Sequence, residues 1–405
     1  MTPTSGYGFA CTKMVARISV QSDWAACLRK VEGEAWVSCK IPGKTTVYGA
    51  LKCEGMRPDG TPDVTSSEDF SVLEITKKSL LIACPAQNVA SKFLAPYTSF
   101  PRVHQKSVTC LDVSSGGGLG VSTSTDGSMK IFQTNNGETR RVLEGHVYDV
   151  NCCRFFPSGM VVLSGGMDAQ VKIWSVEDAS CPVTFKGHKG GILDLAVVDR
   201  GRNVVSCSRD GTARLWDCGR SSCLAVVADC GAAINGISIG VADNAIDLGT
   251  PETTPSDREI GSEGKLLLLA REDRKLEAVS LQSRQSVFTF DGTDAFNCCT
   301  FLSSVNVLGG SQDGNIYQLD IRSTKVPVQT VFRSGAPVLS LTPFREGFAA
   351  SQGDGTCFIL RQDLDHVLEL TDPDCDPVYK VAVFEKWAYT CCRDGIIRKY
   401  QLADL

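Results

Sequence analysis

Histidines and aspartates recur at a fixed interval in the first half of this 405-residue chain. His104, His146 and His188 lie 42 residues apart, and an aspartate follows each of them after 22 residues. An apolar run, an acidic turn and a second apolar run then recur together four more times. A period of about 40 to 45 residues is typical of one four-stranded propeller blade. We therefore predict seven blades, one for each turn acid: Asp126, Asp168, Asp210, Asp273, Asp313, Asp354 and Asp394.

The second and third repeats also share short sequence motifs. Each begins with Gly-His, and the segments KIW at 172–174 and RLWD at 214–217 occupy equivalent positions. These motifs resemble the WD repeat. The resemblance implies a buried chain in which the Trp N–H reaches Ser, Ser reaches His and His donates to Asp. Two such tetrads are expected, formed by His146, Ser164, Asp168 and Trp174 and by His188, Ser206, Asp210 and Trp216.

Serine, histidine and aspartate are also the components of a hydrolase triad. A catalytic constellation is needed once, whereas this set recurs in a fixed lattice. The sequence also lacks a phosphate loop and a His-Glu-x-x-His motif. We therefore predict that the tetrads are structural and that the protein has no catalytic residue, no cofactor and no enzymatic activity.

We expect the chain to form two domains. Ring closure removes an open sheet edge, so the three strands predicted in the last blade need a fourth. The segment SFPRVHQ at 99–105 is expected to supply it. Residues 96–405 are accordingly assigned to an all-β, seven-bladed WD-repeat propeller, and residues 1–95 to a small α/β domain with a loose start. In that domain Asp23 should cap a helix over 24–36, and strands are expected at 45–53, 70–76 and 79–84.

Composition excludes several classes of protein. Hydrophobic residues make up 42% of the chain and charged residues 21%, as in soluble globular proteins, and no apolar run is long enough to cross a membrane. The 19 cysteines show no metal-ligand spacing. Neighbouring residues of a strand point to opposite faces, so the adjacent pairs at 152–153, 298–299 and 391–392 are predicted to be reduced core residues rather than a metal site. Reduced cysteines indicate a cytoplasmic protein, with the nucleus as an alternative.

Acidic residues concentrate in the second half, where residues 220–405 contain 25 acidic and 17 basic side chains. One acidic segment, 242–264, is expected to be a solvated loop on the bottom face, with Thr250 and Thr254 as candidate kinase sites. The opposite, upper rim should be formed by the residues that precede each turn acid. We predict a partner-binding site there, and an acidic surface favours a basic protein over nucleic acid. The alternative is an ordinary solvated turn. The predicted site comprises Asp149, Glu272, Asp372, Asp374 and Asp376.

Longer stretches of the sequence resemble one family. EGHVYDVNCCRFFPSG at 144–159, SRDGTARLWDCG at 208–219 and CCRDGIIRKYQL at 391–402 are similar to the proteasomal ATPase-associated factors, and the resemblance extends over almost the entire chain. It implies a non-enzymatic chaperone, monomeric on its own. Such a chaperone would bind the C-terminal domain of an AAA ATPase subunit of the proteasome regulatory particle and control its association with the core particle.

Two other classes remain open. LDIR at 319–322 partly resembles the WDxR box by which propeller substrate receptors join cullin ubiquitin ligases, although leucine replaces its tryptophan. An enzyme is the third class. Co-purification would separate the three, because ATPase subunits, a cullin adaptor or substrate turnover would each identify one of them.

Overall fold

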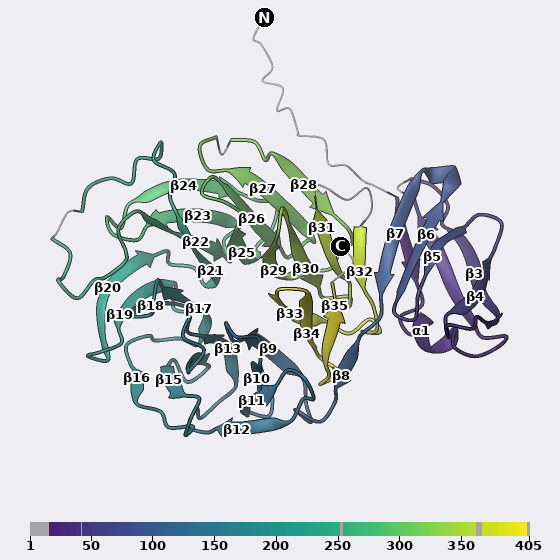
Figure 1. Ribbon diagram of the computed structural model, residues 1–405. Coiled ribbons are helices and arrows are strands. Elements are labelled where there is room, and N and C mark those ends of the chain that lie inside the picture. Colours follow the sequence, from purple (N-terminus) through teal and green to yellow (C-terminus); the bar gives the residue numbers. More distant parts are fainter. Residues whose placement is uncertain (1–15, 42, 252–253, 324, 362–366, 403–405) are drawn as a thin grey trace, which may run out of the picture.

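The computed structural model describes residues 16–405 except 42, 252–253, 324, 362–366 and 403–405. In this part of the chain, seven sheets are arranged in a ring (Figure 1), so the propeller prediction is confirmed. Each of these sheets contains one turn acid, between the second and third strands counted outward from the centre of the ring. Most of the predicted loose start, residues 1–15, lies outside the described residues.

Blades one to five each consist of four antiparallel strands that follow one another along the chain. Blade one contains β9 (Val108–Val113), β10 (Leu119–Ser124), β11 (Met129–Gln133) and β12 (Thr139–Leu143). Blade two contains β13 (Val150–Phe155), β14 (Val161–Gly166), β15 (Val171–Ser175) and β16 (Val183–Phe185). Blade three contains β17 (Ile192–Val198), β18 (Asn203–Ser208), β19 (Thr212–Asp217) and β20 (Ser222–Asp229). Blade four contains β21 (Ile234–Val241), β22 (Lys265–Arg271), β23 (Lys275–Ser280) and β24 (Ser286–Asp291). Blade five contains β25 (Phe296–Phe301), β26 (Asn306–Ser311), β27 (Asn315–Asp320) and β28 (Gln329–Phe332).

Blades six and seven take strands from the N-terminal part of the chain. Blade six contains β29 (Val338–Phe344), β30 (Gly347–Gln352), β31 (Cys357–Arg361) and β32 (Val367–Leu370). Blade seven contains β33 (Val378–Phe384), β34 (Trp387–Cys392), β35 (Ile397–Gln401) and β8 (Thr98–Phe100). Antiparallel pairing of Ile397 with Phe100 closes the ring. The closing strand thus comes from the predicted segment, but it ends at Phe100 because the chain then turns to bury His104.

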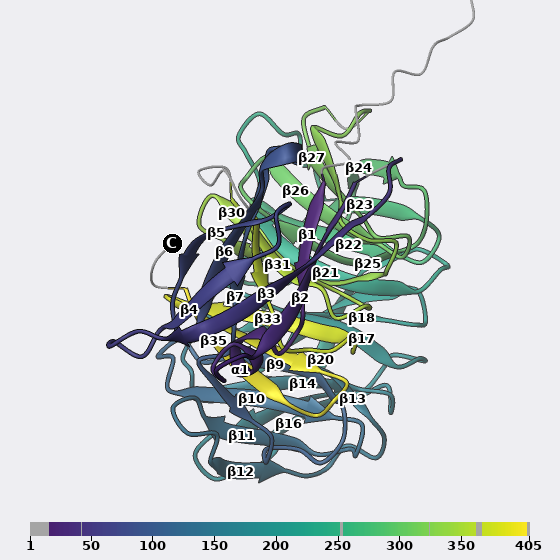
Figure 2. The ribbon, with the colours of Figure 1, turned by 90° about the vertical axis from the view of Figure 1, so that its right-hand side faces the viewer.

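The N-terminal region forms two sheets that pack on one core (Figure 2). The first contains β1 (Arg17–Val20), β2 (Glu34–Lys40), β3 (Val47–Met56) and β4 (Pro62–Ser66). The second contains β5 (Ser71–Ile75), β6 (Ser79–Cys84) and β7 (Val89–Leu94), and a 3-10 turn (Pro85–Gln87) joins the last two. Because β7 pairs in parallel with β32, this second sheet continues blade six into one sheet of seven strands. Hydrogen bonds of one sheet therefore connect the region before residue 95 to the propeller.

The helix predicted over 24–36 is only one turn long, α1 (Trp24–Cys27). A Cβ atom on Gly33 would lie 2.0 Å from the carbonyl oxygen of Cys27, so the chain approaches itself closely where the helix was expected to continue. Beyond this point Ala35, Val37 and Cys39 are buried at alternate positions, which is the periodicity of a strand. The N-terminal region is consequently almost entirely β rather than the expected mixture of helix and strand.

Candidate functional site

Blades two and three contain the hydrogen-bonded tetrads that the repeat implied. In blade two the Trp174 indole N–H donates to Ser164 Oγ over 2.8 Å, Ser164 Oγ lies 2.7 Å from His146 Nε2, and His146 Nδ1 lies 3.0 Å from Asp168. In blade three the corresponding distances are 2.8, 2.8 and 2.9 Å, between Trp216, Ser206, His188 and Asp210. Every polar side chain in the two tetrads thus has a hydrogen-bonding partner, and these hydrogen bonds offset the cost of burying the polar groups.

Burial also determines the charge of these histidines. Removal from water lowers the pKa of His146 and of His188 below the ordinary value, although Asp168 and Asp210 oppose that shift. A neutral ring can accept from the serine at Nε2 and donate to the aspartate at Nδ1. The side chains of His146 and His188 are 2% and 1% exposed, so no substrate can reach them. The tetrads are therefore structural elements.

Blade one retains only part of this chain. His104 Nε2 lies 2.8 Å from Ser122 Oγ, but its Nδ1 faces Ser128 Oγ at 3.0 Å instead of the turn acid. Phe132 replaces the indole donor and is fully buried. Burial, with a smaller contribution from Lys130, lowers the pKa of His104 to about 4.

The upper rim, meaning the ends of the blades at which the turn acids lie, is built by one repeated backbone contact. In every blade the residue before the turn acid donates its N–H to the carbonyl of the residue just before the innermost strand, over 2.8–3.0 Å. The donors are Thr125, Met167, Arg209, Glu272, Gln312, Gly353 and Arg393, which are the residues expected on this rim. The acceptors include Asp149, so the structure brings Asp149 to the same rim.

Arginines neutralise two carboxylates of the predicted acidic site, and an asparagine forms a hydrogen bond with a third. Asp372 forms an ion pair with the buried Arg398, Asp376 lies 2.7 Å from Arg393, and Glu272 accepts a 2.6 Å hydrogen bond from Asn235. Asp149 and Asp374 are exposed, and no ion pair involves either of them in the described part of the chain. Of the five predicted residues, these two therefore keep both their charge and their hydrogen-bonding groups for a partner. Glu272 is exposed and keeps its charge as well, but it is hydrogen-bonded to Asn235.

The N-terminal region positions the acidic segment 371–377. The Trp24 indole N–H donates to Thr371 Oγ1 over 3.0 Å, and Thr371 donates its backbone N–H to the Leu94 carbonyl over 2.9 Å. On the other side the Tyr400 hydroxyl donates to the Thr371 carbonyl over 2.6 Å. Asp372 and Cys375 adopt positive φ angles of 102° and 57°, a conformation that such fixed ends help to maintain. Sequence reasoning missed this link because Trp24 and Thr371 are 347 residues apart.

A groove of about 270 Å³ lies between this segment and the first N-terminal sheet. Trp36, which is 50% exposed, lines the groove together with Asp354 and Asp374. Arg17 also lines the groove and offsets part of the charge of Asp354, so Asp374 and the indole face are the groups that suit a basic side chain. The rim thus combines negative charge with one aromatic surface.

The segment 242–264 differs from the solvated loop that was expected. Arg258 Nε lies 2.7 Å from Asp217, and the N–H of Ile260 donates to Asn203 Oδ1 over 2.7 Å. Residues 242–264 therefore pack against blades three and four over part of their length. The candidate kinase sites Thr250 and Thr254 are both exposed.

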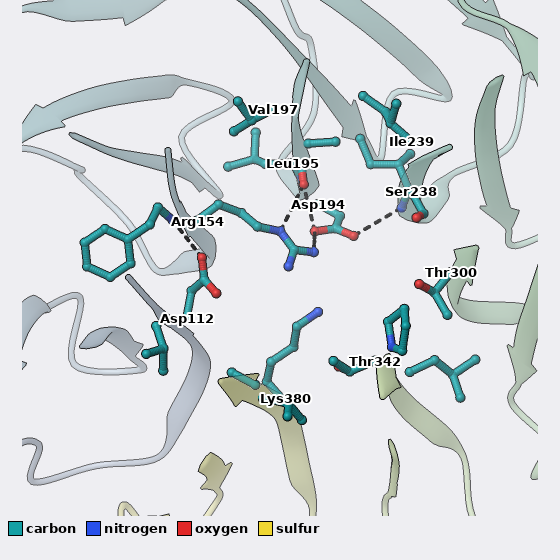
Figure 3. A pocket seen from close by; sticks show the side chains of 18 of the residues that line it. Asp112, Arg154, Asp194, Leu195, Val197, Ser238, Ile239, Thr300, Thr342 and Lys380 are labelled. Carbon is teal, nitrogen blue, oxygen red and sulfur yellow. Dashed lines mark hydrogen bonds and ion pairs between the residues drawn. The ribbon is translucent and has the colours of Figure 1, made fainter. Parts of the chain in front are cut away.

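The central channel contains a cavity of about 460 Å³ that is lined by the innermost strands of all seven blades (Figure 3). Arg154, Asp194, Asp112 and Lys380 are its charged residues. Ser238 also lines it and stands within Gly-Ile-Ser-Ile-Gly at 236–240. This is the spacing of a nucleophile elbow, so the expectation that the chain lacks the Gly-x-Ser-x-Gly motif was wrong. That elbow requires a sharp turn between a strand and a helix, whereas Ser238 lies inside β21 and pairs with Leu268. The spacing alone therefore does not indicate a hydrolase.

The remaining predicted features give no other site. The cysteines of the described residues are free thiols, and no group of three or more His, Cys, Asp or Glu among them could hold a metal ion. No helix in these ranges is both long and apolar enough to cross a membrane. In the partial WDxR box, the Arg322 guanidinium lies 2.6 Å from its own neighbour Asp320.

Comparison with known proteins identifies relatives over nearly the full length. Residues 96–133, 137–175 and 179–217 match the family described as WD domain, G-beta repeat. The chain is 72% identical to proteasomal ATPase-associated factor 1 of Gallus gallus and 71% identical to that of Homo sapiens. Each alignment covers 97% of this chain and 100% of the relative. A probable proteasomal ATPase-associated factor 1 of Dictyostelium discoideum is 37% identical, with 95% of each chain covered.

Proposed function

Because the chain belongs to the proteasomal ATPase-associated factor 1 family, we propose that it binds the C-terminal domain of an AAA ATPase subunit of the proteasome regulatory particle and controls that subunit's association with the core particle. On this proposal the protein is a non-enzymatic assembly chaperone. It acts as a monomer, in the cytoplasm or the nucleus.

The observation that carries the proposal is the upper rim beside the N-terminal sheet. Exposed Asp149 and Asp374 provide negative charge, and Trp36 provides an apolar contact next to Asp374. A basic face of an ATPase domain would be attracted to this charge, and an aromatic anchor would add contact energy once the two proteins touch. Asp372 and Asp376 contribute less, because arginines already neutralise them.

The proposal is tested by measuring association rates between the purified chain and each ATPase C-terminal domain at several salt concentrations. We expect Asp149→Lys with Asp374→Lys to slow association about 10-fold at low salt and to weaken its salt dependence, since exposed charges mainly steer encounter. Neither side chain is buried, so the melting temperature should change little.

A charge-matched control exists at the opposite ends of blades six and seven. Glu346 and Glu385 are exposed acids in the turns that follow β29 and β33. Replacing both with Lys changes the total charge by the same amount but should leave the association rate nearly unchanged. If this control pair slows association and the rim pair does not, the docking surface is on the other face. If no ATPase domain binds, the proposed function is wrong.

A further inference from the structure

The charged side chains of the central channel differ in how many of their hydrogen-bonding groups have a partner. The two carboxylates are held by backbone N–H groups: Asp112 accepts from Phe155 over 2.7 Å, and Asp194 accepts from Leu195 over 2.9 Å and from Ile237 over 3.1 Å. The contacts with Phe155 and Ile237 link neighbouring innermost strands. Both carboxylates thus form hydrogen bonds that connect neighbouring blades.

The two cations retain free donors. Arg154 uses Nε for the Leu195 carbonyl and Nη2 for Asp194, each over 3.2 Å, which leaves Nη1 without an acceptor in the described part of the chain. Among the same residues, no acceptor lies within hydrogen-bonding distance of Lys380 Nζ. Figure 3 shows the Lys380 amine and the Arg154 guanidinium pointing into the cavity from different blades.

This arrangement places two positive groups on one small cavity. Burial lowers the pKa of Arg154, but the charges of Asp194 and Asp112 outweigh it and raise that pKa above its ordinary value, so Arg154 stays cationic. Like charges that face one another repel, and an anion between them replaces repulsion with attraction. The hydroxyls of Ser238 and Thr300 line the same cavity and can also donate.

We propose that the central channel is a binding site for an oxyanion, which lies between Arg154 Nη1 and Lys380 Nζ. The ligand must provide acceptors, because the free hydrogen-bonding groups of the two charged cavity residues are donors. A cavity of about 460 Å³ accommodates a small phosphate or one carboxylate-bearing chain end. With Asp112 and Asp194 present, the four charged groups sum to zero, so we expect a compact anion rather than a polyanion.

Calorimetric titration at constant ionic strength tests the proposal with two probes. The first is inorganic phosphate, and the second is an N-acetylated tripeptide with a free C-terminal carboxylate, measured against its C-terminal amide. Saturable binding of phosphate alone identifies a free oxyanion as the ligand. Binding of the tripeptide acid but not of the amide identifies a chain terminus. Both results support the site, whereas no saturable binding of either probe overturns it.

Variants locate the binding. Lys380→Met removes one cation and should weaken binding of the active probe about 10-fold, the loss of one charge-assisted hydrogen bond. Lys386→Met is the matched control, since Lys386 is an exposed lysine of the same blade that does not line the cavity. Equal weakening by both variants, or by neither, would place any observed binding elsewhere.

A second measurement does not depend on the ligand. Without added oxyanion, Lys380→Met should change the melting temperature little, because it removes no hydrogen bond and the relieved repulsion from Arg154 is offset by the lost attraction to Asp112. A large fall in melting temperature would mean that Lys380 has a structural partner, and the oxyanion site would then be wrong.

Discussion

In blades two and three the turn acid lies beside a histidine, whereas in blades four and seven it lies beside an arginine. Asp168 and Asp210 accept hydrogen bonds from the neutral rings of His146 and His188, within hydrogen-bonded chains that each lie in one blade. Asp273 instead lies 2.6 Å from Arg271, and Asp394 lies 2.5 Å from Arg398. In each of these four blades the turn acid has a side-chain partner, which is a histidine in two blades and an arginine in the other two.

The difference determines whether the turn acid and its partner also contact segments outside the blade. A histidine chain ends at its own tryptophan, so blades two and three are self-contained. Arg398 also pairs with Asp372 on the acidic segment, and in blade six Glu369 binds both Arg333 and Arg17 of the N-terminal region. Blades six and seven, which connect the propeller to its additional domain and to the proposed docking rim, thus use arginine contacts instead of a tetrad, as blade four also does.

The largest test of this comparison removes the N-terminal support altogether. A chain that begins at Ser107 lacks β8, so blade seven has an open edge and the ring cannot close. We expect no cooperative thermal unfolding and poor solubility. A chain that begins at Pro96 keeps β8 and should melt cooperatively, although at a lower temperature because β32 has lost its partner β7. Cooperative unfolding of the shorter chain would show that strand closure is unnecessary.

The next test removes one charge from the contact between blade six and the N-terminal region. Glu369→Gln leaves the guanidinium of Arg333, which is 7% exposed, without its ionic partner. Removing one member of a buried ion pair should cost about 3–5 kcal/mol, measurable by urea unfolding. Asp63→Asn is the control, because its partner Arg57 and Asp63 are both exposed, and it should barely move the midpoint. Similar effects of the two variants would contradict a special role for the buried contact.

The sequence predicted the repeated parts of the molecule well and the unique parts poorly. The period of the turn acids indicates the propeller, and the spacing of His146, Ser164 and Trp174 indicates their hydrogen bonds, because both are local patterns that recur. The pairing of β7 with β32 and the contact from Trp24 to Thr371 each occur once and join distant segments. No periodicity signals them. The partners of Asp372 and Asp376 were missed for the same reason.

On the other side of the comparison, a single tetrad should be worth less than the buried ion pair. His146→Ala removes one buried hydrogen bond from Ser164, which then keeps only Trp174, and one from Asp168, which then keeps only backbone N–H donors. This loss should lower the free energy of unfolding by about 1–3 kcal/mol. Because the change lies within one blade, association of the folded fraction with an ATPase domain should be normal. Loss of binding at unchanged stability would show instead that His146 serves the interface.

The smallest expected effect concerns the incomplete chain of blade one and depends on pH. His104 has a pKa of about 4 when folded and about 6.5 when unfolded, so only the unfolded chain takes up a proton as the pH falls through this window. The stability linked to the neutral ring is therefore present above pH 6.5 and is lost as the pH drops towards 4. Between pH 7 and about pH 5.5 the protein should lose roughly 1 kcal/mol more than a His104→Gln variant, in which this position no longer titrates. His146 and His188 titrate in both proteins and cancel in the difference. Urea unfolding of the two proteins at each pH measures this difference in stability loss. Equal losses would mean that His104 has the same pKa in the folded and the unfolded protein.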